Sequence, residues 1–359
     1  MTIRDTFNAE AAKRILITDG AFGTEIQNWK LSEADYAGTL TLGHDQKGNN
    51  DILALTKPEV PEAIHRAYFE AGADIAETNT FSANRISQAD YGAEGLVREI
   101  NVESAKLARR IADEYQAKDA EKGILRPRFV AGAIGPTNKT LSLSPDVNDP
   151  GYREIDFDYL KDVYREQIDA LVEGGADFVL IETVFDTLNA KAGIMAAIEA
   201  GEALGRDLPI MLSMTLTDLS GRNLSGHTVE AFWHAVRHAK PLTIGLNCSF
   251  GAEQLRPHVK TLSELCDTLI MVYPNAGLPN ELGAYAEAPA TTAGLVGEWA
   301  FAGQVNVLGG CCGSTPAHIK AIADHVRGMT PRKVAVPPVR TRLAGLEPFT
   351  MAAYAVAPA

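Results

Sequence analysis

Cysteine, positive charge and long apolar runs are all scarce in this sequence. Four cysteines in 359 residues do not make a disulfide scaffold of the secreted type, so a reduced, cytoplasmic enzyme is expected. The formal charge of −13 argues against a nucleic-acid-binding surface, which needs clustered Lys and Arg. No apolar run reaches the roughly 18–20 residues that span a membrane. Residues 1–14 also lack the apolar core of a signal peptide.

What the sequence does have is a short apolar run, a turn and a longer amphipathic stretch, repeated along the chain. The apolar runs are brief and rich in β-branched residues, which is typical of buried parallel strands. The predicted strands are 15–18, 73–76, 129–134, 178–181, 210–214, 243–246, 269–272 and 305–308. The predicted helices are 58–71, 95–118, 159–173, 189–204, 228–239, 253–266, 291–301 and 316–326.

Eight such units in one chain predict a single (β/α)8 barrel. An open doubly wound sheet is the alternative, but no GxGxxG motif follows the first predicted strand. We expect residues 1–14 to form an N-terminal helix or lead-in and residues 15–330 to form the barrel. Residues 331–359, rich in Pro and Ala, are expected to form a strap or linker. Residues 27–57 make a long loop after the first strand, which suggests a lid or a docking surface.

Three of the four cysteines come directly after predicted strands. Cys248 follows the sixth strand, and Cys311 and Cys312 follow the eighth. Active sites of such barrels lie at the C-terminal ends of the strands, so these thiols should converge there. Three thiolates make a plausible zinc site with one open position. Buried packing and a redox disulfide between the adjacent pair remain alternatives, whereas Cys266, inside a predicted helix, is expected to serve packing alone.

Such a zinc site would suit a substrate that brings a thiol of its own. Three thiolate ligands donate electrons strongly and leave the metal a poor activator of water. A free thiol has a pKa of about 8.5 and is mostly protonated at neutral pH, whereas zinc coordination deprotonates it. The chemistry would then be alkyl transfer to sulfur, without a general base. A metal-buffering or redox-sensing protein and an aldolase-type barrel are weaker alternatives, since no lysine ends a predicted strand.

Several segments carry a family resemblance as well. They are DGAFGT (19–24), KGNND (47–51), ETNTF (77–81), GPTN (135–138), SPDVND (144–149), ETVFDTLNAK (182–191), LNC (246–248), PNAGLP (274–279) and GGCCG (309–313). With these motifs the chain resembles the homocysteine S-methyltransferase family, over about residues 15–348. In that family the three cysteines bind zinc, which here implies Zn²⁺ held by Cys248, Cys311 and Cys312, and homocysteine as the substrate.

Two of the segments point to one branch of the family. Residues 144–149 and 184–191 resemble the homocysteine-binding module of cobalamin-dependent methionine synthases more than relatives that use betaine or S-methylmethionine. The resemblance therefore implies methylcobalamin as the methyl donor, with the other two donors as the alternative. This chain ends eleven residues after Pro348 and has no Asp-x-His-x-x-Gly cobalamin signature. We therefore expect a separate cobalamin- and folate-binding methionine synthase chain as the partner.

The amino-acid part of homocysteine sets the remaining candidates. Its α-ammonium group favours carboxylates, and its α-carboxylate favours backbone N–H groups. Asp19 and Glu182 end predicted strands and resemble substrate-binding positions of the family; Glu77 is a third candidate. The backbone of Gly20 and Ala21 can approach a ligand closely. A rim ion pair or a cap is the alternative for each carboxylate.

Asn275 follows the seventh predicted strand, between the strands that carry the cysteines. It is a candidate fourth metal ligand when substrate is absent. Turn formation in the Pro-Asn-Ala-Gly segment is the alternative role.

Overall fold

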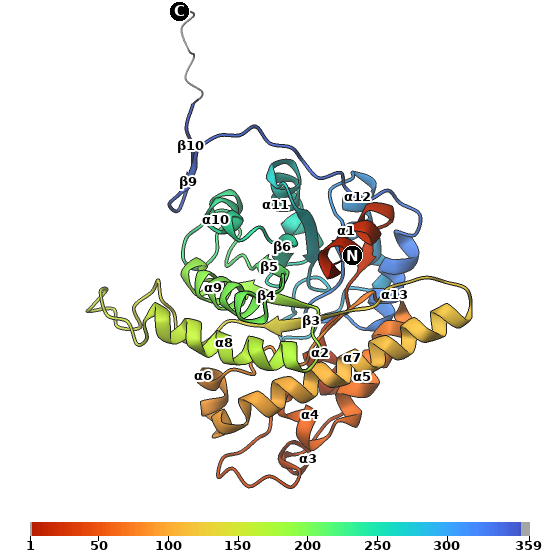
Figure 1. Cartoon of the computed structure of the whole chain (residues 1–359), viewed down its shortest axis with the longest axis vertical. Helices are drawn as coiled ribbons and strands as arrows, with labels where there is room; N and C mark the ends of the chain where they lie inside the picture. Colours follow the sequence, from red (N-terminus) through yellow and green to blue (C-terminus); the bar gives the residue numbers. More distant parts are fainter. Residues whose placement is uncertain (1, 353–359) are drawn as a thin grey trace, which may run out of the picture.

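The structure is a computed structural model that describes residues 2–352 of the chain. Eight parallel strands form one sheet in the order β1-β8-β7-β6-β5-β4-β3-β2, curved into a barrel with the helices outside (Figure 1). The predicted (β/α)8 barrel is confirmed. The barrel strands are β1 Leu16–Ile17, β2 Ile75–Glu77, β3 Phe129–Ile134, β4 Phe178–Val184, β5 Ile210–Met214, β6 Thr243–Asn247, β7 Leu269–Tyr273 and β8 Val307–Leu308.

The helices of the eight units are close to those predicted, with ends that move by a few residues. They are α5 Glu59–Ala71, α7 Val97–Glu121, α8 Phe157–Glu173, α9 Thr187–Leu204, α10 Val229–Val236, α11 Ala252–Leu265, α12 Pro289–Phe301 and α13 Pro316–His325. No helix in the described part of the chain is long and apolar enough to cross a bilayer.

The predicted end of one strand was wrong. The fourth strand was expected to end at Ile181, but β4 continues to Val184 through a register shift against β5, so Glu182 lies inside the strand. The predicted long connection after the first strand is present, and residues 27–57 of it hold the end of α2 (Phe22–Asn28) and two short helices, α3 (Glu33–Ala37) and α4 (Leu53–Thr56). Helix α3 begins with a capping box in which Ser32 and Asp35 satisfy each other's backbone N–H groups.

The chain before the first strand forms helix α1 (Ile3–Lys13), which plugs the N-terminal end of the barrel. Its Phe7 is fully buried, and its ring centroid lies 5.2 Å from those of Phe129 and Phe178 on β3 and β4. These three rings fill the bottom of the barrel interior together with side chains of the other strands. The opposite, C-terminal end is left open for a site.

The tail after α13 contains a hairpin that the sequence did not predict. Strands β9 (Arg342–Ala344) and β10 (Pro348–Thr350) pair antiparallel and contact α10. Before the hairpin, the guanidinium group of Arg332 donates to the carbonyl oxygens of Ser263, Cys266 and Thr268. The tail therefore crosses the outside of the barrel to reach α10 (Figure 1).

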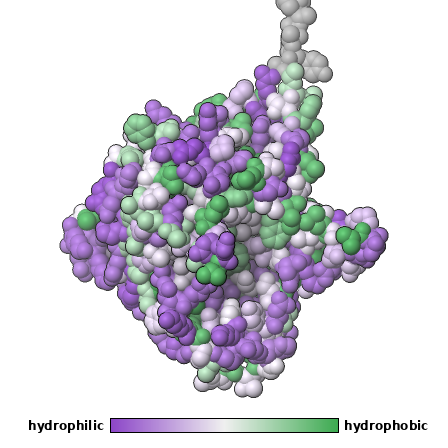
Figure 2. Space-filling view, turned by 180° about the vertical axis from the view of Figure 1, so that it is seen from behind, coloured by the Kyte–Doolittle hydropathy of each residue, from purple (hydrophilic) through white to green (hydrophobic). Residues whose placement is uncertain are grey.

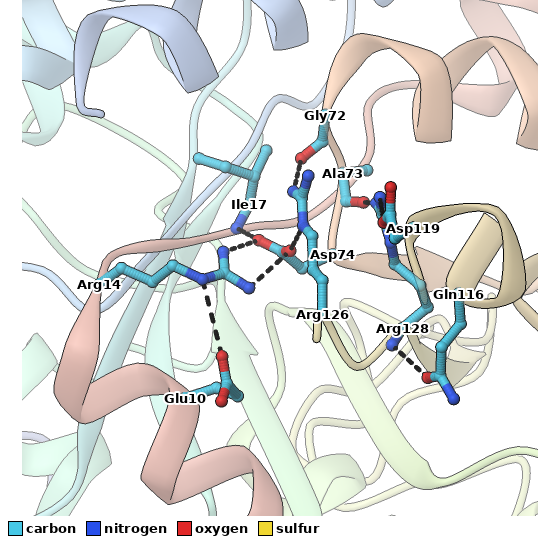
Figure 3. A network of polar contacts seen from close by, with 10 residues as sticks. All are labelled: Glu10, Arg14, Ile17, Gly72, Ala73, Asp74, Gln116, Asp119, Arg126 and Arg128. Atoms are coloured by element: carbon cyan, nitrogen blue, oxygen red, sulfur yellow. Dashed lines mark hydrogen bonds and ion pairs between the residues drawn. The ribbon is translucent and has the colours of Figure 1, made fainter. Parts of the chain in front are cut away.

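The barrel closes between β1 and β2, where an ion-pair network supports a short backbone contact. Asp74, fully buried just before β2, accepts hydrogen bonds from Arg14, from Arg126 and from the N–H of Ile17 (Figure 3). Burial acts to raise the pKa of Asp74, but the two guanidinium groups outweigh it and hold the pKa below its usual value. The contact between β1 and β2, which is the seam of the barrel, thus depends on the ionised form of the Asp74 carboxylate.

Replacing Asp74 by Asn should lower the free energy of unfolding by about 3–5 kcal/mol, because it leaves two arginines without their buried counter-charge. Urea unfolding followed by circular dichroism measures this. Asp324→Asn is the matched control, since Asp324 also pairs with two cations, Lys320 and Arg327, but at the surface; its cost should stay within about 1 kcal/mol. Equal effects of the two substitutions would contradict the role given to Asp74.

The same carboxylate predicts the direction of acid sensitivity. Because its folded-state pKa is depressed, its contribution is fully present above the ordinary value of 3.8 and is lost as the pH falls through the folded value. Asp74→Asn should therefore unfold with a weaker pH dependence below pH about 4 than the unchanged protein.

Candidate functional site

A cavity of about 880 Å³ opens at the C-terminal ends of the strands. Helix α1 closes the barrel on the side seen in Figure 1, and Figure 2 looks from behind, onto a face with a hollow bordered by hydrophilic and hydrophobic side chains. The residues around the cavity come from the loops after most of the strands. Among the predicted site residues, Gly20, Ala21, Glu77, Glu182, Cys248, Cys311 and Cys312 line it.

The three cysteines that follow β6 and β8 do converge. The sulfur atoms of Cys248 and Cys312 are 3.7 Å apart, those of Cys311 and Cys312 are 4.0 Å apart, and all three lie within 4.8 Å of one another. Thiolates at about 2.3 Å from a tetrahedral zinc would be separated by about 3.8 Å. The spacing of the sulfur atoms therefore fits three corners of a zinc site. Cys266 lies elsewhere, in the hydrophobic core.

The thiols also bear on one another's protonation. Hydrogen bonds from the Cys248 and Cys311 thiols lower the pKa of Cys312 to about 3. The pKa of Cys311 is raised far above its usual value by its hydrogen bonds to Cys248 and Cys312 and by burial. Without a cation, one thiolate is therefore stabilised at the expense of its neighbours, and a bound divalent cation would favour ionisation of all three.

Asn247 organises the turn that presents Cys248. Its side-chain oxygen accepts from the N–H of Thr183 at 3.1 Å and from the hydroxyl of Ser213 at 2.6 Å. Its amide nitrogen donates to the Thr183 hydroxyl at 2.9 Å and lies 3.8 Å from the sulfur of Cys311. One buried amide thus connects the ends of β4, β5 and β6 to the cysteine pair.

The backbone next to Asn247 is in an uncommon conformation. Thr183, Cys248 and Ser249 have φ of 55°, 61° and 59°, in the left-handed region. That region costs residues with a side chain roughly 1–2 kcal/mol each, and such strain persists where the surrounding structure fixes it. The direction of the Cys248 side chain is therefore set by the backbone of the turn.

Three carboxyl groups lie below the rim, and they differ in position. Glu77 and Glu182 line the cavity, whereas Asp19, 1% exposed, is not among its lining residues. Asp19 accepts a hydrogen bond from the N–H of Glu77 at 2.9 Å, and the hydroxyl of Tyr273 donates to Glu182 at 3.1 Å. The structure thus places Glu77, which the sequence ranked third, on the wall of the cavity and Asp19 behind it.

The surroundings of the three carboxyl groups disfavour their charged form. Burial raises the pKa of Glu182 to about 7. Burial and the charge of Glu182 raise those of Asp19 and Glu77 well above their usual range. Among residues 2–352, no Lys or Arg forms a salt bridge with any of the three. An ammonium group in the cavity would favour their ionised form.

The glycine-rich turn after β1 lies against the cavity, as expected, but part of its backbone is already hydrogen-bonded within the protein. The N–H of Ala21 donates to the hydroxyl of Ser314 at 3.2 Å. A Cβ atom at Gly20 would come within 2.8 Å of the Tyr68 ring and 2.9 Å of Ser314. Close packing therefore requires glycine at this position, whether or not the backbone also meets a ligand.

Asn275 is buried beside the cysteine loop but does not line the cavity. Its N–H donates to the carbonyl oxygen of Phe250, and the next N–H, of Ala276, donates to that of Cys312. Its side-chain oxygen is buried without a hydrogen-bond partner in the described part of the chain. A free acceptor there is compatible with the predicted fourth ligand, which stays a prediction.

Three residues of the site were missed by the sequence analysis. Asn247 stands beside Cys248 in the motif, so its position could have drawn notice. Tyr273 extends the predicted seventh strand by one residue. Tyr285, which lines the cavity and helps to lower the pKa of Cys312, lies in a loop that carries no sequence signal.

The comparisons with known proteins agree with this geometry. A family model described as homocysteine S-methyltransferase matches residues 16–326. The crystal structure of the metallated form of the homocysteine methyltransferase MmuM from Escherichia coli has a TM-score of 0.66 and 25% identity, covering 87% of this chain and 96% of that one. The apo form of the same enzyme, at 24% identity and a TM-score of 0.61 over 87% and 96% of the two chains, shows the likeness of fold. The chain belongs to the homocysteine S-methyltransferase family.

Proposed function

We propose that this protein methylates the sulfur of homocysteine to give methionine, with Zn²⁺ held by Cys248, Cys311 and Cys312. The observation that carries the proposal is the placement of three thiols within 4.8 Å of one another in a cavity that Glu77 and Glu182 also line. When bound, zinc would deprotonate the substrate thiol and leave its sulfur nucleophilic. Four free cysteines in the chain support a reducing compartment, and we propose the cytoplasm.

The chain's own residues would bind and orient the amino acid. Glu77 and Glu182 would receive the α-ammonium group, with the hydroxyl of Tyr273 fixing the direction of Glu182. Asp19 would act behind them by holding the N–H of Glu77. Asn247 would keep Cys248 and Cys311 in position through its four polar contacts. No residue is required as a general base.

We further propose methylcobalamin as the donor, carried by a separate cobalamin- and folate-binding chain. The resemblance of residues 144–149 and 184–191 to cobalamin-dependent methionine synthases supports this, and the second segment is hydrogen-bonded to the stretch just before the first. Asp186 at the start of α9 accepts from the N–H and the hydroxyl of Ser142, and Asn189 bonds to the backbone of Leu141 and Lys139. The side chains of Val147 and Leu188 are exposed by 97% and 38% and add apolar surface to these two segments.

Such a partner would have to present its methyl group at the open face of the barrel. We propose that it docks over the cavity, against residues 27–57 and the loops after β6, β7 and β8. Because one cobalamin domain must also visit its folate-binding module, the contact is expected to be transient.

The metal assignment predicts about one zinc per chain. Changing Cys248, Cys311 or Cys312 to Ala should remove most of the zinc, as measured by elemental analysis, and abolish methyl transfer. Circular dichroism should show that the barrel stays folded. Cys266→Ala is the control with an unchanged zinc content, because Cys266 lies in the hydrophobic core. Full zinc content in Cys311→Ala would overturn the site.

The carboxylate assignment predicts a preference for the amino group of the substrate. Glu182→Gln should weaken homocysteine binding by about 10–100-fold, the loss expected for one charge-assisted hydrogen bond. It should hardly change the binding of 4-mercaptobutyrate, which lacks the ammonium group. Asp90→Asn, on the wall of the same cavity, is the control. Calorimetry measures the affinity of both thiols for the unchanged protein and for the two variants. Equal weakening of both thiols by Glu182→Gln would contradict the assignment.

The raised pKa of Glu182, about 7, gives that preference a pH dependence. Ionised Glu182 attracts the ammonium group and protonated Glu182 does not, so the affinity ratio of homocysteine to 4-mercaptobutyrate should rise between about pH 6 and pH 8. Asp19 and Glu77, whose pKa values are also raised, extend the rise to higher pH. In Glu182→Gln the part of the rise near neutral pH should disappear.

The donor is tested by comparing methyl sources. Alone, the protein should methylate homocysteine slowly and only at high concentrations of free methylcobalamin, and a cobalamin-loaded partner chain should increase the rate. Faster turnover with betaine or S-methylmethionine than with either cobalamin source would assign the donor to that alternative while leaving homocysteine as the acceptor.

A further inference from the structure

A second cavity, of about 620 Å³, lies away from the thiols, where the tail meets the barrel. Its walls come from α1, from the turn after α10, from the segments leading into β6 and β7, and from the tail around β9. Pro241 and Thr268, which precede β6 and β7, place it at the N-terminal ends of the strands. The site described above lies at the opposite ends, so the two cavities are separate.

The side chains around this second cavity are strongly basic. Seven of its eleven lining residues are Arg, Lys or His, and Asp267 is the one carboxylate among them. Asp267 forms an ion pair with Arg237, and Arg4 is paired with Asp207 at 2.7 and 3.1 Å. Such a concentration of cations stands out in a chain with a formal charge of −13.

Three of the cations have no counter-charge. Lys240, Arg340 and Arg342 form no salt bridge with any carboxylate in the described part of the chain. They approach the cavity from two sides, Lys240 from the barrel and the two arginines from the tail. Mutual repulsion across the cavity is therefore uncompensated unless an anion lies between them.

Buried polar atoms add an independent indication. The side chain of His234 is 2% exposed, yet neither ring nitrogen makes a hydrogen bond; the nearest acidic atom is an oxygen of Glu230 at 3.5 Å. One terminal nitrogen of Arg342 is also buried without a partner. Buried donors without partners are uncommon because each costs about 1–3 kcal/mol. Acceptor oxygens brought against this wall would satisfy the one N–H of the neutral imidazole and the free N–H groups of Arg342.

We propose that this cavity is a binding site for a multivalent oxyanion of the phosphate-ester class. Guanidinium groups match phosphate oxygens in pairs and bind them more strongly than they bind single-charge anions. The volume exceeds what a bare phosphate fills, which leaves room for an attached organic group. The proposal is independent of the methyl-transfer chemistry and needs no covalent step.

Binding there would fasten the tail to the barrel. Arg342 begins β9 of the hairpin, and the hairpin turn reaches the loop between β5 and α10: the N–H of Thr228 donates to the carbonyl oxygen of Leu346 at 3.2 Å, and Arg222 pairs with Glu347. An anion that holds Arg340 and Arg342 against Lys240 should therefore reduce opening of the hairpin, which is otherwise a two-stranded element at the surface.

The test is calorimetric titration of the full chain, at low salt, with pyrophosphate, inorganic phosphate, glycerol 3-phosphate and chloride. We expect saturable binding of the phosphate compounds, none of chloride, and weakening as salt is added. The double variant Arg340→Gln/Arg342→Gln should weaken pyrophosphate by about tenfold or more. Lys260→Gln/Arg327→Gln, which removes the same charge from exposed positions elsewhere on the surface, should not. Stronger binding of glycerol 3-phosphate than of inorganic phosphate would identify an ester as the ligand; the reverse order would identify free phosphate.

Amide hydrogen exchange in the hairpin is a second test of the proposal. Pyrophosphate should slow amide exchange in β9 and β10 of the unchanged protein and of the control variant, but not in Arg340→Gln/Arg342→Gln. Absence of saturable binding up to about 10 mM, or equal affinity of the double variant and the control, would overturn the proposal. Methyl transfer should be the same in both variants, which separates a failure here from a failure of the proposed function.

Discussion

Everything at the open end of the barrel depends on how β1 and β2 are held together. These two strands share a single bridge, between Thr18 and Ile75, and the backbone of β1 is only two residues long as a strand. Two aspartates complete the seam from its two ends. Asp74 bonds to the N–H of Ile17 at the lower end, and Asp19 bonds to the N–H of Glu77 at the upper end. Since the loops after these strands line the cavity, the shape of the site rests on this closure.

The two aspartates sit in opposite electrostatic surroundings. Asp74 has two arginines beside it and a lowered pKa. Asp19 has other acids nearby and a raised one. The charge of Asp74 is thus neutralised within the protein, whereas the open end holds carboxyl and thiol groups without a basic partner among the described residues. A substrate with an ammonium group and a divalent metal ion would supply the charges that this end lacks.

The sequence predicted the parts of this arrangement that depend on chain position alone. Cys248, Cys311 and Cys312 follow strands, and parallel strands in a barrel end on one side, so their meeting could be foreseen. Which carboxyl group faces the cavity could not be foreseen, because Asp19 turns to the N–H of Glu77 through tertiary contacts. The hairpin was missed because its strands are three residues each in a Pro-rich segment. The basic cavity was missed because its residues range from Arg4 to Arg342, and charge alone does not reveal such long-range neighbours.

The left-handed backbone at Cys248 sets chemistry against stability at one position. Glycine adopts that conformation without steric cost, so random substitution guided by folding alone would favour glycine there over every residue with a sulfur atom. Glycine at this position would relieve the steric cost of the turn and would remove one of the three sulfur atoms that lie within 4.8 Å of one another.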